Sequence, residues 1–239
     1  MEEERELSVV ILCYKAGESA RQFVEEVRAL FQKESIFDYE LILVGNYLPG
    51  SGDITPAVVR ELAGKYTNVR YTAKEKEGMM GWDMKSGLSL AGGRYISVID
   101  GDGQMPIEDL VKVYRKITSA GADLVKTYRL ERGDSLWRKL ISWLYNFFFS
   151  LLFFGFGVKD VNSKPKIFSR EAFKKLDLAS DDWFIDAEIM IQARRLGFKI
   201  IEIPTVFIGL VGRRSFVSAK TVMEFIKNLI IYRFKEFFK

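Results

Sequence analysis

The chain has 239 residues, of which 48% are hydrophobic, 28% are charged and one is a cysteine. This length and composition support one folded domain with a full apolar core; they exclude a disordered chain and an internal disulfide framework. The 36 Lys and Arg residues against 32 Asp and Glu leave a formal charge of +4, which suits an anionic ligand or lipid headgroups but is too small to indicate a nucleic-acid partner.

Residues 1–6 are mostly acidic, unlike the basic start of a secretory signal, so we expect the chain to stay in the cytoplasm. Beyond them, apolar strand-like runs alternate with amphipathic stretches. In chain order we expect a strand at 9–13, a helix at 19–32, a strand at 40–45, a helix at 56–65, a strand at 69–72, a helix at 81–91, a strand at 94–100, a helix at 107–120 and a strand at 123–127. This order predicts a mostly parallel α/β sheet flanked by helices, with ligands beyond the carboxyl ends of the strands.

The second half of the chain differs in character. Residues 140–158 carry no charge and are rich in Phe, and they are long enough to span a bilayer. Polar residues nevertheless recur every four positions as Arg138, Ser142, Asn146 and Ser150, which is typical of a helix with one polar stripe. We therefore interpret 136–157 as a helix that lies on a membrane surface; burial in the core is the competing interpretation.

A polar loop at 159–166, a helix at 186–196 and a strand at 199–203 are expected next. The last expected helix, 217–239, combines basic and aromatic residues as helices at membrane surfaces do. Packing into a homodimer is the alternative for this helix. We predict a single domain over 1–239 that is peripheral to the cytoplasmic face of the membrane.

An acidic motif follows the strand expected at 94–100. Asp100 and Asp102 are separated by one glycine and come directly after an apolar run. Their carboxylates, with the amide oxygen of Gln104, are hard ligands suited to Mg²⁺ or Mn²⁺, which would then bind phosphate oxygens. The competing interpretation is a solvated turn, because Asp and Gly are ordinary turn residues. Histidine is absent, so histidine ligands and histidine bases are excluded.

Further residues extend this motif into a family resemblance. The pattern Asp-x-Asp-x-Gln-x-Pro over residues 100–106 resembles the inverting GT-A glycosyltransferases of family 2, and specifically their polyprenyl-phosphate sugar synthase branch, typified by dolichol-phosphate mannose synthase. Other matching positions are Gly81, Gly87, Leu88, Ala91, Gly93, Tyr95, Tyr128, Trp137, Asp160, Ser163, Phe168, Ser169, Arg170, Arg194, Gly197, Glu202 and Pro204. The resemblance implies a Rossmann-like GT-A sheet, a nucleotide-sugar donor (a GDP- or UDP-sugar) and a polyprenyl phosphate acceptor.

The resemblance also implies roles for individual residues. Asp100 and Asp102 would be catalytic and bind the metal and the donor diphosphate, with Gln104 assisting. Arg129 would be catalytic too, and the acceptor's phosphate would be held by Arg129, Arg138 and Ser142; the guanidinium fork of Arg suits phosphate oxygens. The donor-binding residues would be Tyr14, Glu18, Asn46, Asp53, Asp100, Gln104, Arg213 and Arg214.

The chain departs from the family pattern in several loops. Gly45 and Asn46 replace an acidic pair that contacts the nucleotide, which argues against assuming GDP. Ser163-Lys164-Pro165 stands where the family has Ser-Gly-Phe. These departures place the chain in a side branch and leave the base, the sugar and the acceptor open.

The expected reaction is a single displacement with inversion at the sugar's anomeric carbon. An acceptor phosphate is already anionic and needs little help from a base, whereas a hydroxyl acceptor, the alternative, needs one. Asp186 and Glu188 are the candidate bases, although we prefer to interpret them as charges at a helix N-terminus. A nucleotidyltransferase fits less well because residues 13–18 lack a Gly-rich basic loop. A non-catalytic, membrane-bound pseudoenzyme is disfavoured by the retained acidic motif.

Overall fold

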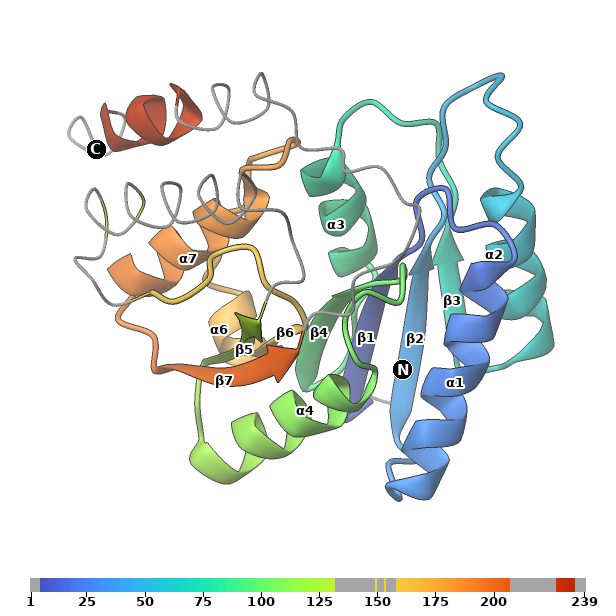
Figure 1. Cartoon of the computed structure of the whole chain (residues 1–239), viewed down its shortest axis with the longest axis horizontal. Coiled ribbons are helices and arrows are strands. Elements are labelled where there is room, and N and C mark those ends of the chain that lie inside the picture. The colour runs from blue at the N-terminus through green and yellow to red at the C-terminus, as the bar shows by residue number, and fades with distance from the viewer. Residues whose placement is uncertain (1–4, 132–148, 150–152, 154–157, 207–226, 235–239) are drawn as a thin grey trace.

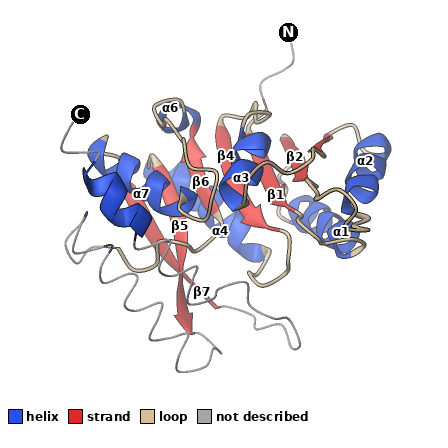
Figure 2. Cartoon of the chain, turned by 90° about the horizontal axis from the view of Figure 1, so that it is seen from above, coloured by secondary structure: helices blue, strands red, loops and turns tan. Residues whose placement is uncertain are grey.

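The computed structural model describes residues 5–131, 149, 153, 158–206 and 227–234. In this part of the chain, one seven-stranded sheet has the strand order β3-β2-β1-β4-β6-β5-β7, and helices lie on both of its faces (Figures 1 and 2). The strands are β1 (Leu7–Leu12), β2 (Tyr39–Val44), β3 (Val69–Thr72), β4 (Tyr95–Asp100), β5 (Leu124–Glu131), β6 (Lys166–Ser169) and β7 (Ile200–Val206). The helices are α1 (Ser19–Lys33), α2 (Thr55–Lys65), α3 (Met80–Leu88), α4 (Glu108–Ala120), α6 (Arg170–Phe173) and α7 (Ile185–Arg195).

The direction of one strand interrupts an otherwise parallel sheet. β6 runs antiparallel to its neighbours β4 and β5, whereas every other strand pair is parallel. The predicted α/β class with a mostly parallel sheet is therefore confirmed. The sequence analysis did not predict β6 and assigned its first residue to a polar loop. A segment of four residues that begins with a lysine is too short to show the alternating hydrophobic pattern of a strand.

Alternate residues of the central strands supply two separate cores. In β1, Val9 and Ile11 face the core that α1, α2 and α4 cover, whereas Val10 and Leu12 face the core that α3 and α7 cover. Every residue of β1 and β2 is buried. A sheet with helices on both faces has no solvent side, which explains why these strands are mostly apolar without polar alternation; their polar residues Ser8 and Glu40 are buried and hydrogen-bonded to each other.

The helices of the first half follow their amphipathic spacing closely. α1 buries Phe23, Val27 and Phe31, which recur at intervals of four residues along one side of the helix. α4 ends at Gly121, whose φ of 54° is a left-handed conformation that glycine adopts without a steric penalty. Both helices begin and end within two residues of the expected positions.

The two helices expected at a membrane surface lie largely outside the described residues. Within 136–157, only Phe149 and Phe153 are described; Phe149 is fully buried and its ring centroid lies 5.6 Å from that of Phe153. Within 217–239, residues 227–234 are helical, and Tyr232 packs against Phe184 with ring centroids 5.3 Å apart. Among the helices of the described residues, none has the length and hydrophobicity needed to cross a membrane.

Candidate active site

Three strands end together at one edge of the sheet. Leu12, at the end of β1, is in register with Val44 at the end of β2 and with Asp100 at the end of β4. The loops that follow carry Tyr14, Asn46 and the acidic motif, so the parallel sheet brings these distant segments to one edge. This is where ligands of such sheets bind.

The acidic loop turns directly over β1. The backbone N–H of Gly101 donates to the carbonyl oxygen of Leu12 at 2.9 Å. A Cβ at this position would lie 2.9 Å from Ile11 Cγ2 and 3.2 Å from that same carbonyl oxygen, so only glycine fits. Beyond it, Asp102 Oδ1 accepts a hydrogen bond from the backbone N–H of Gln104 at 3.0 Å, which fixes the direction of one carboxylate oxygen within the turn.

The loop offers the right chemistry for a hard divalent cation, but few ligands. The described residues contain no group of three or more His, Cys, Asp or Glu side chains placed to hold a metal. Mg²⁺ is commonly bound by one or two carboxylates together with substrate phosphates, rather than by a complete cage of protein ligands. Asp100 and Asp102 fit that kind of site, with the diphosphate of a donor as the remaining ligand.

A buried lysine reaches the acidic loop from the other half of the chain. Lys164 Nζ lies 3.4 Å from Asp100 Oδ2 and 3.0 Å from Asp186 Oδ2, and its side chain is only 3% exposed. Lys166 Nζ donates to the other oxygen of Asp186 at 2.6 Å. Two ammonium groups and two carboxylates therefore form one cluster, the lysine–aspartate cluster (Asp100, Lys164, Lys166 and Asp186), between the acidic loop and α7.

The pKa values of this cluster favour the ionised forms of Lys164 and Asp186. Burial by itself would lower the pKa of Lys164, but the carboxylates of Asp100 and Asp186 outweigh it, and this pKa is raised. Burial would raise the pKa of Asp186, yet the two lysines hold it below its ordinary value. For Lys166 burial dominates, and its pKa is lowered to about 8. Lys164 is therefore a fixed positive charge beside Asp100.

The segment that replaces the family's acidic pair is closely packed. Asn46 is fully buried, and its Nδ2 donates to Asp83 Oδ1 and Ser86 Oγ, both at 2.9 Å. At Gly45, a Cβ would lie 2.7 Å from Val59 Cγ2, so α2 leaves no room for a side chain. The structure thus gives Asn46 partners inside the protein, and its predicted contact with the donor stays a prediction.

Lys76 links the ring of Tyr14 to this segment. The Lys76 ammonium lies 4.3 Å from the centroid of the Tyr14 ring, within the range of a cation–π interaction. Lys76 also forms an ion pair with Asp83, the carboxylate that Asn46 contacts. Lys76 and Asp83, which the sequence reading did not single out, therefore connect Tyr14 to the buried amide.

The other two predicted donor-binding residues lie on the loops before α1 and α2. Glu18 is exposed and pairs with Arg21 at 3.0 Å. Asp53 Oδ1 accepts from the backbone N–H of Thr55 at 2.9 Å, and the hydroxyl of Thr55 accepts from Gly17 N at 2.8 Å. Asp53 Oδ2 is buried and accepts no hydrogen bond from the described part of the chain, and the predicted contact of Asp53 with the donor stays a prediction.

Arg129 lies near the carboxyl end of β5 and is held by a carboxylate. Its Nε and Nη2 donate to the two oxygens of Asp160 at 2.6 and 3.0 Å. Both side chains are largely buried, with exposures of 17% and 5%. This two-point contact fixes the plane of the guanidinium. A guanidinium held in one plane has the fork geometry that suits phosphate oxygens.

The two candidate bases are engaged inside the protein. Asp186 and Glu188 lie in the first turn of α7 and are both buried. Glu188 accepts hydrogen bonds from the backbone N–H groups of Ala179 and Ser180, the latter at 2.8 Å. Asp186 belongs to the lysine–aspartate cluster. Both carboxylates therefore have partners inside the protein, and their role as candidate bases stays a prediction.

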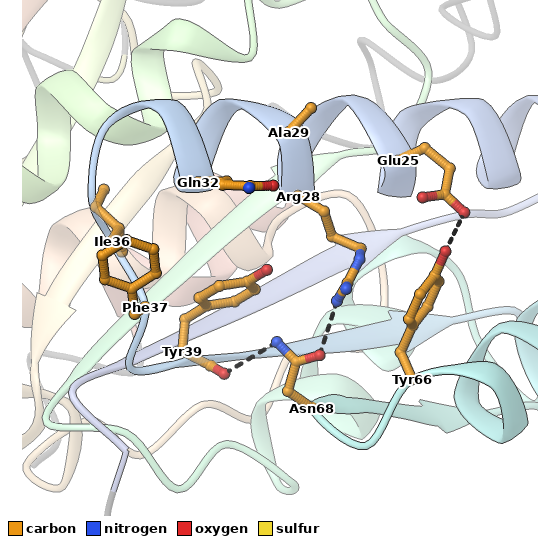
Figure 3. A pocket seen from close by; sticks show the side chains of 9 residues that line it. All are labelled: Glu25, Arg28, Ala29, Gln32, Ile36, Phe37, Tyr39, Tyr66 and Asn68. Atoms are coloured by element: carbon orange, nitrogen blue, oxygen red, sulfur yellow. Dashed lines mark hydrogen bonds between the residues drawn. The ribbon is translucent and has the colours of Figure 1, made fainter.

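Four predicted site residues, Arg138, Ser142, Arg213 and Arg214, lie outside the described residues, and their proposed roles stay predictions. A pocket lies at the amino ends of β2 and β3, at the opposite end of the strands from the acidic loop (Figure 3). There Arg28 stacks on Tyr66 at 3.7 Å and donates to Asn68 Oδ1, so the polar groups of that pocket mainly satisfy one another.

Comparisons with known proteins agree with this geometry. Residues 8–177 match the family described as Glycosyl transferase family 2. A Trichomonas vaginalis protein named "Dolichyl-phosphate beta-glucosyltransferase ALG5A" is 25% identical over 95% of this chain and 74% of its own length. The dodecaprenyl-phosphate galacturonate synthase of Rhizobium johnstonii is 28% identical over 80% of this chain and 57% of its own length.

A solved structure shares the fold. The glucosyl-3-phosphoglycerate synthase of Mycobacterium tuberculosis, crystallised with Mn²⁺, uridine diphosphate and phosphoglyceric acid, superposes with a TM-score of 0.70 and 18% identity. The alignment covers 96% of this chain and 78% of that one. At this identity the likeness supports the GT-A architecture, and the ligands are those of the neighbour.

Proposed function

The chain belongs to glycosyl transferase family 2, and on that premise we propose that it transfers a sugar from a nucleotide-sugar donor to the phosphate of a polyprenyl lipid. The observation that carries the proposal is the position of Asp100 and Asp102 at the shared edge of β1, β2 and β4. Relatives named for dolichyl and dodecaprenyl phosphate support the acceptor class.

The donor end of the site is built from the acidic loop and Tyr14. Asp100 and Asp102 would hold Mg²⁺ or Mn²⁺, which, when bound, neutralises the charge that develops on the departing diphosphate. Gln104, which follows in the same turn, supports the loop through its backbone N–H. We favour a UDP-sugar over a GDP-sugar, because the solved neighbour binds uridine diphosphate and because the acidic pair of the family pattern is replaced here.

The acceptor end of the site is assigned to Arg129. Asp160 fixes its guanidinium at the carboxyl end of β5, where a phosphate can be held in one orientation for attack on the anomeric carbon. A phosphate needs no base, whereas a hydroxyl does. Because Asp186 and Glu188 are buried and engaged, the described residues favour a phosphate acceptor over the hydroxyl alternative.

The decisive experiment offers the purified protein a polyprenyl phosphate with radiolabelled UDP- and GDP-sugars, with and without Mn²⁺. We expect label in the lipid phase only with metal, and loss of transfer by at least about a hundredfold in Asp102→Asn, because charge stabilisation by a bound metal is lost. Asp177→Asn, which changes an exposed carboxylate, is the matched control and should keep full activity. Transfer that survives both metal removal and Asp102→Asn would refute the proposal.

We further propose that the protein meets the cytoplasmic face of the membrane through residues 227–234. Ile230, Ile231 and Phe234 are 45%, 39% and 62% exposed, and apolar side chains on one helix face are what interfacial helices insert. Ile230→Glu with Phe234→Glu should abolish flotation with anionic vesicles, whereas Phe37→Glu, at an apolar residue that is 72% exposed on a distant loop, should not. Unchanged flotation with conversion of a dimer to a monomer would instead assign the face to a homodimer.

A further inference from the structure

A positive charge is built into the proposed donor site. We propose that Lys164 is a resident cation that competes with the divalent metal for Asp100, so that the metal binds weakly until a donor diphosphate arrives. The inference rests on the proposed function, because it assigns Asp100 to the metal. The observation behind it is that Lys164 Nζ lies 3.4 Å from Asp100 Oδ2 and that the Lys164 side chain is only 3% exposed.

The contact engages one of the two carboxylate oxygens of Asp100, a residue that would hold the metal. Asp100 is 36% exposed, so one side of its carboxylate faces the site while Oδ2 faces the buried ammonium. A metal bound to Asp100 would lie a few ångströms from this ammonium, and like charges at such a distance repel strongly where water is excluded. Either the ammonium or the metal must give up part of its contact with the carboxylate.

The charge balance of the lysine–aspartate cluster points the same way. Asp100 and Asp186 carry two negative charges, and Lys164 and Lys166 carry two positive charges, with ion pairs of 2.6 to 3.4 Å between them. The cluster is therefore neutral without any metal. The carboxylate of Asp102, the second proposed ligand, offsets one charge of an added divalent cation, which leaves one excess positive charge for the diphosphate of a donor to offset. Metal and donor should therefore bind together.

Lys164 is a position at which this chain departs from the family pattern. Where the family pattern has glycine between serine and an aromatic residue, this chain has Lys164 between Ser163 and Pro165. Glycine places no charge next to the acidic motif. Two contacts hold the Lys164 ammonium in place, one to each carboxylate, so the lysine is a fixed part of this site and distinguishes it from a site built on the family pattern.

The test measures metal binding without any turnover. Free Mn²⁺ is titrated against the folded protein and followed by its electron paramagnetic resonance signal, first without nucleotide and then with uridine diphosphate. Lys164→Met removes the charge and keeps the length of the side chain. We expect it to tighten Mn²⁺ binding in the absence of nucleotide by at least about tenfold, because a unit charge within about 4–6 Å changes the proton affinity of a carboxylate by about one to three powers of ten and acts on a bound cation in the same direction.

Lys166→Met is the matched control. It removes a buried ammonium of the same cluster that contacts Asp186 and not Asp100, and we expect it to tighten Mn²⁺ binding clearly less than Lys164→Met does. Circular dichroism verifies that each variant is folded, and Lys164→Gln, which keeps hydrogen-bond donors, replaces Lys164→Met if the latter does not fold. An equal tightening in both lysine variants would overturn the proposal, because the contact with Asp100 would then be irrelevant.

The remaining outcomes separate this inference from the proposed function. Mn²⁺ binding that Asp102→Asn abolishes, but that Lys164→Met leaves unchanged, overturns the role of Lys164 and leaves the proposed function intact. No Mn²⁺ binding by any variant, with or without uridine diphosphate, overturns the metal assignment itself and this inference with it.

Discussion

Replacing Asn46 by aspartate tests why this chain lacks the acidic pair of its family. Asn46 is buried, and its amide group donates to Asp83 Oδ1 while its oxygen accepts from Lys74 N, each at 2.9 Å. A carboxylate at this position could still accept from Lys74, but it has no hydrogen to donate. Asn46→Asp would therefore place two carboxylates against each other in a buried site.

The cost follows from two contributions. A hydrogen bond to a charged group contributes about 1.5–3 kcal/mol, and this one is lost. Burial already raises the pKa of Asp83, even though Lys76 and Asn46 act to lower it; a second carboxylate raises it further, and each pKa unit corresponds to about 1.4 kcal/mol. The Lys76 ammonium offsets part of this, so we expect Asn46→Asp to lower the free energy of unfolding by about 2–4 kcal/mol at pH 7.5.

The destabilisation by Asn46→Asp should depend on pH in a definite direction. The carboxylate pair of Asn46→Asp has a folded-state pKa above its unfolded value, so the penalty is absent below the unfolded pKa and grows as the pH rises through the folded pKa. Urea unfolding of the variant and the natural protein at pH 7.5 and pH 5 should show a smaller difference at pH 5, where one proton replaces the lost amide hydrogen. A decrease in the free energy of unfolding below about 1 kcal/mol at pH 7.5, or a decrease independent of pH, would refute the reasoning. Asn162→Asp, at an exposed asparagine, is the control and should lower the free energy of unfolding by less than about 0.5 kcal/mol.

Two further predictions concern the fold. Gly81→Ala should lower the free energy of unfolding by about 1–3 kcal/mol, because its Cβ would lie 2.4 Å from the carbonyl oxygen of Ser180. Gly64→Ala, inside α2, has nothing within 4 Å of the added Cβ and should instead raise the free energy of unfolding by about 0.5–1 kcal/mol. Urea unfolding of each variant checks both predictions. Cys13 is buried, and burial raises the pKa of its thiol to about 12, so iodoacetamide at pH 8 should label the unfolded protein and leave the native one unlabelled for hours, because the thiolate is the nucleophile. Rapid native labelling, measured by mass spectrometry, would contradict the burial.

The sequence predicted what local patterns encode. The apolar runs of β1, β2 and β4 and the amphipathic spacing of α1 and α4 each follow from a short window, and the position of Asp100 after β4 follows from the parallel order. β6 has no such local signal, because it is recognisable as a strand only through its pairing with β4 and β5.

Side-chain partners were harder to predict than positions. Lys164 was visible as a departure from the family pattern, but its contact with Asp100 arises from pairing between segments far apart in the chain. Likewise, Asn46 was expected to face the donor, and nothing local indicated that Asp83 and Ser86, on α3, would take up its amide hydrogens. Such contacts depend on tertiary packing, which a sequence window does not contain.

The antiparallel strand has a consequence for synthesis on the ribosome. β4 lies between β1 and β6 in the sheet, and the Ser97 hydroxyl contacts the carbonyl oxygen of Lys166, 69 positions later. While the chain is being made, β4 therefore presents unpaired backbone groups until β6 emerges, and open strand edges invite pairing with other chains. Truncated chains that end before Lys166 should aggregate, and slow translation between β4 and β6 should prolong the vulnerable interval.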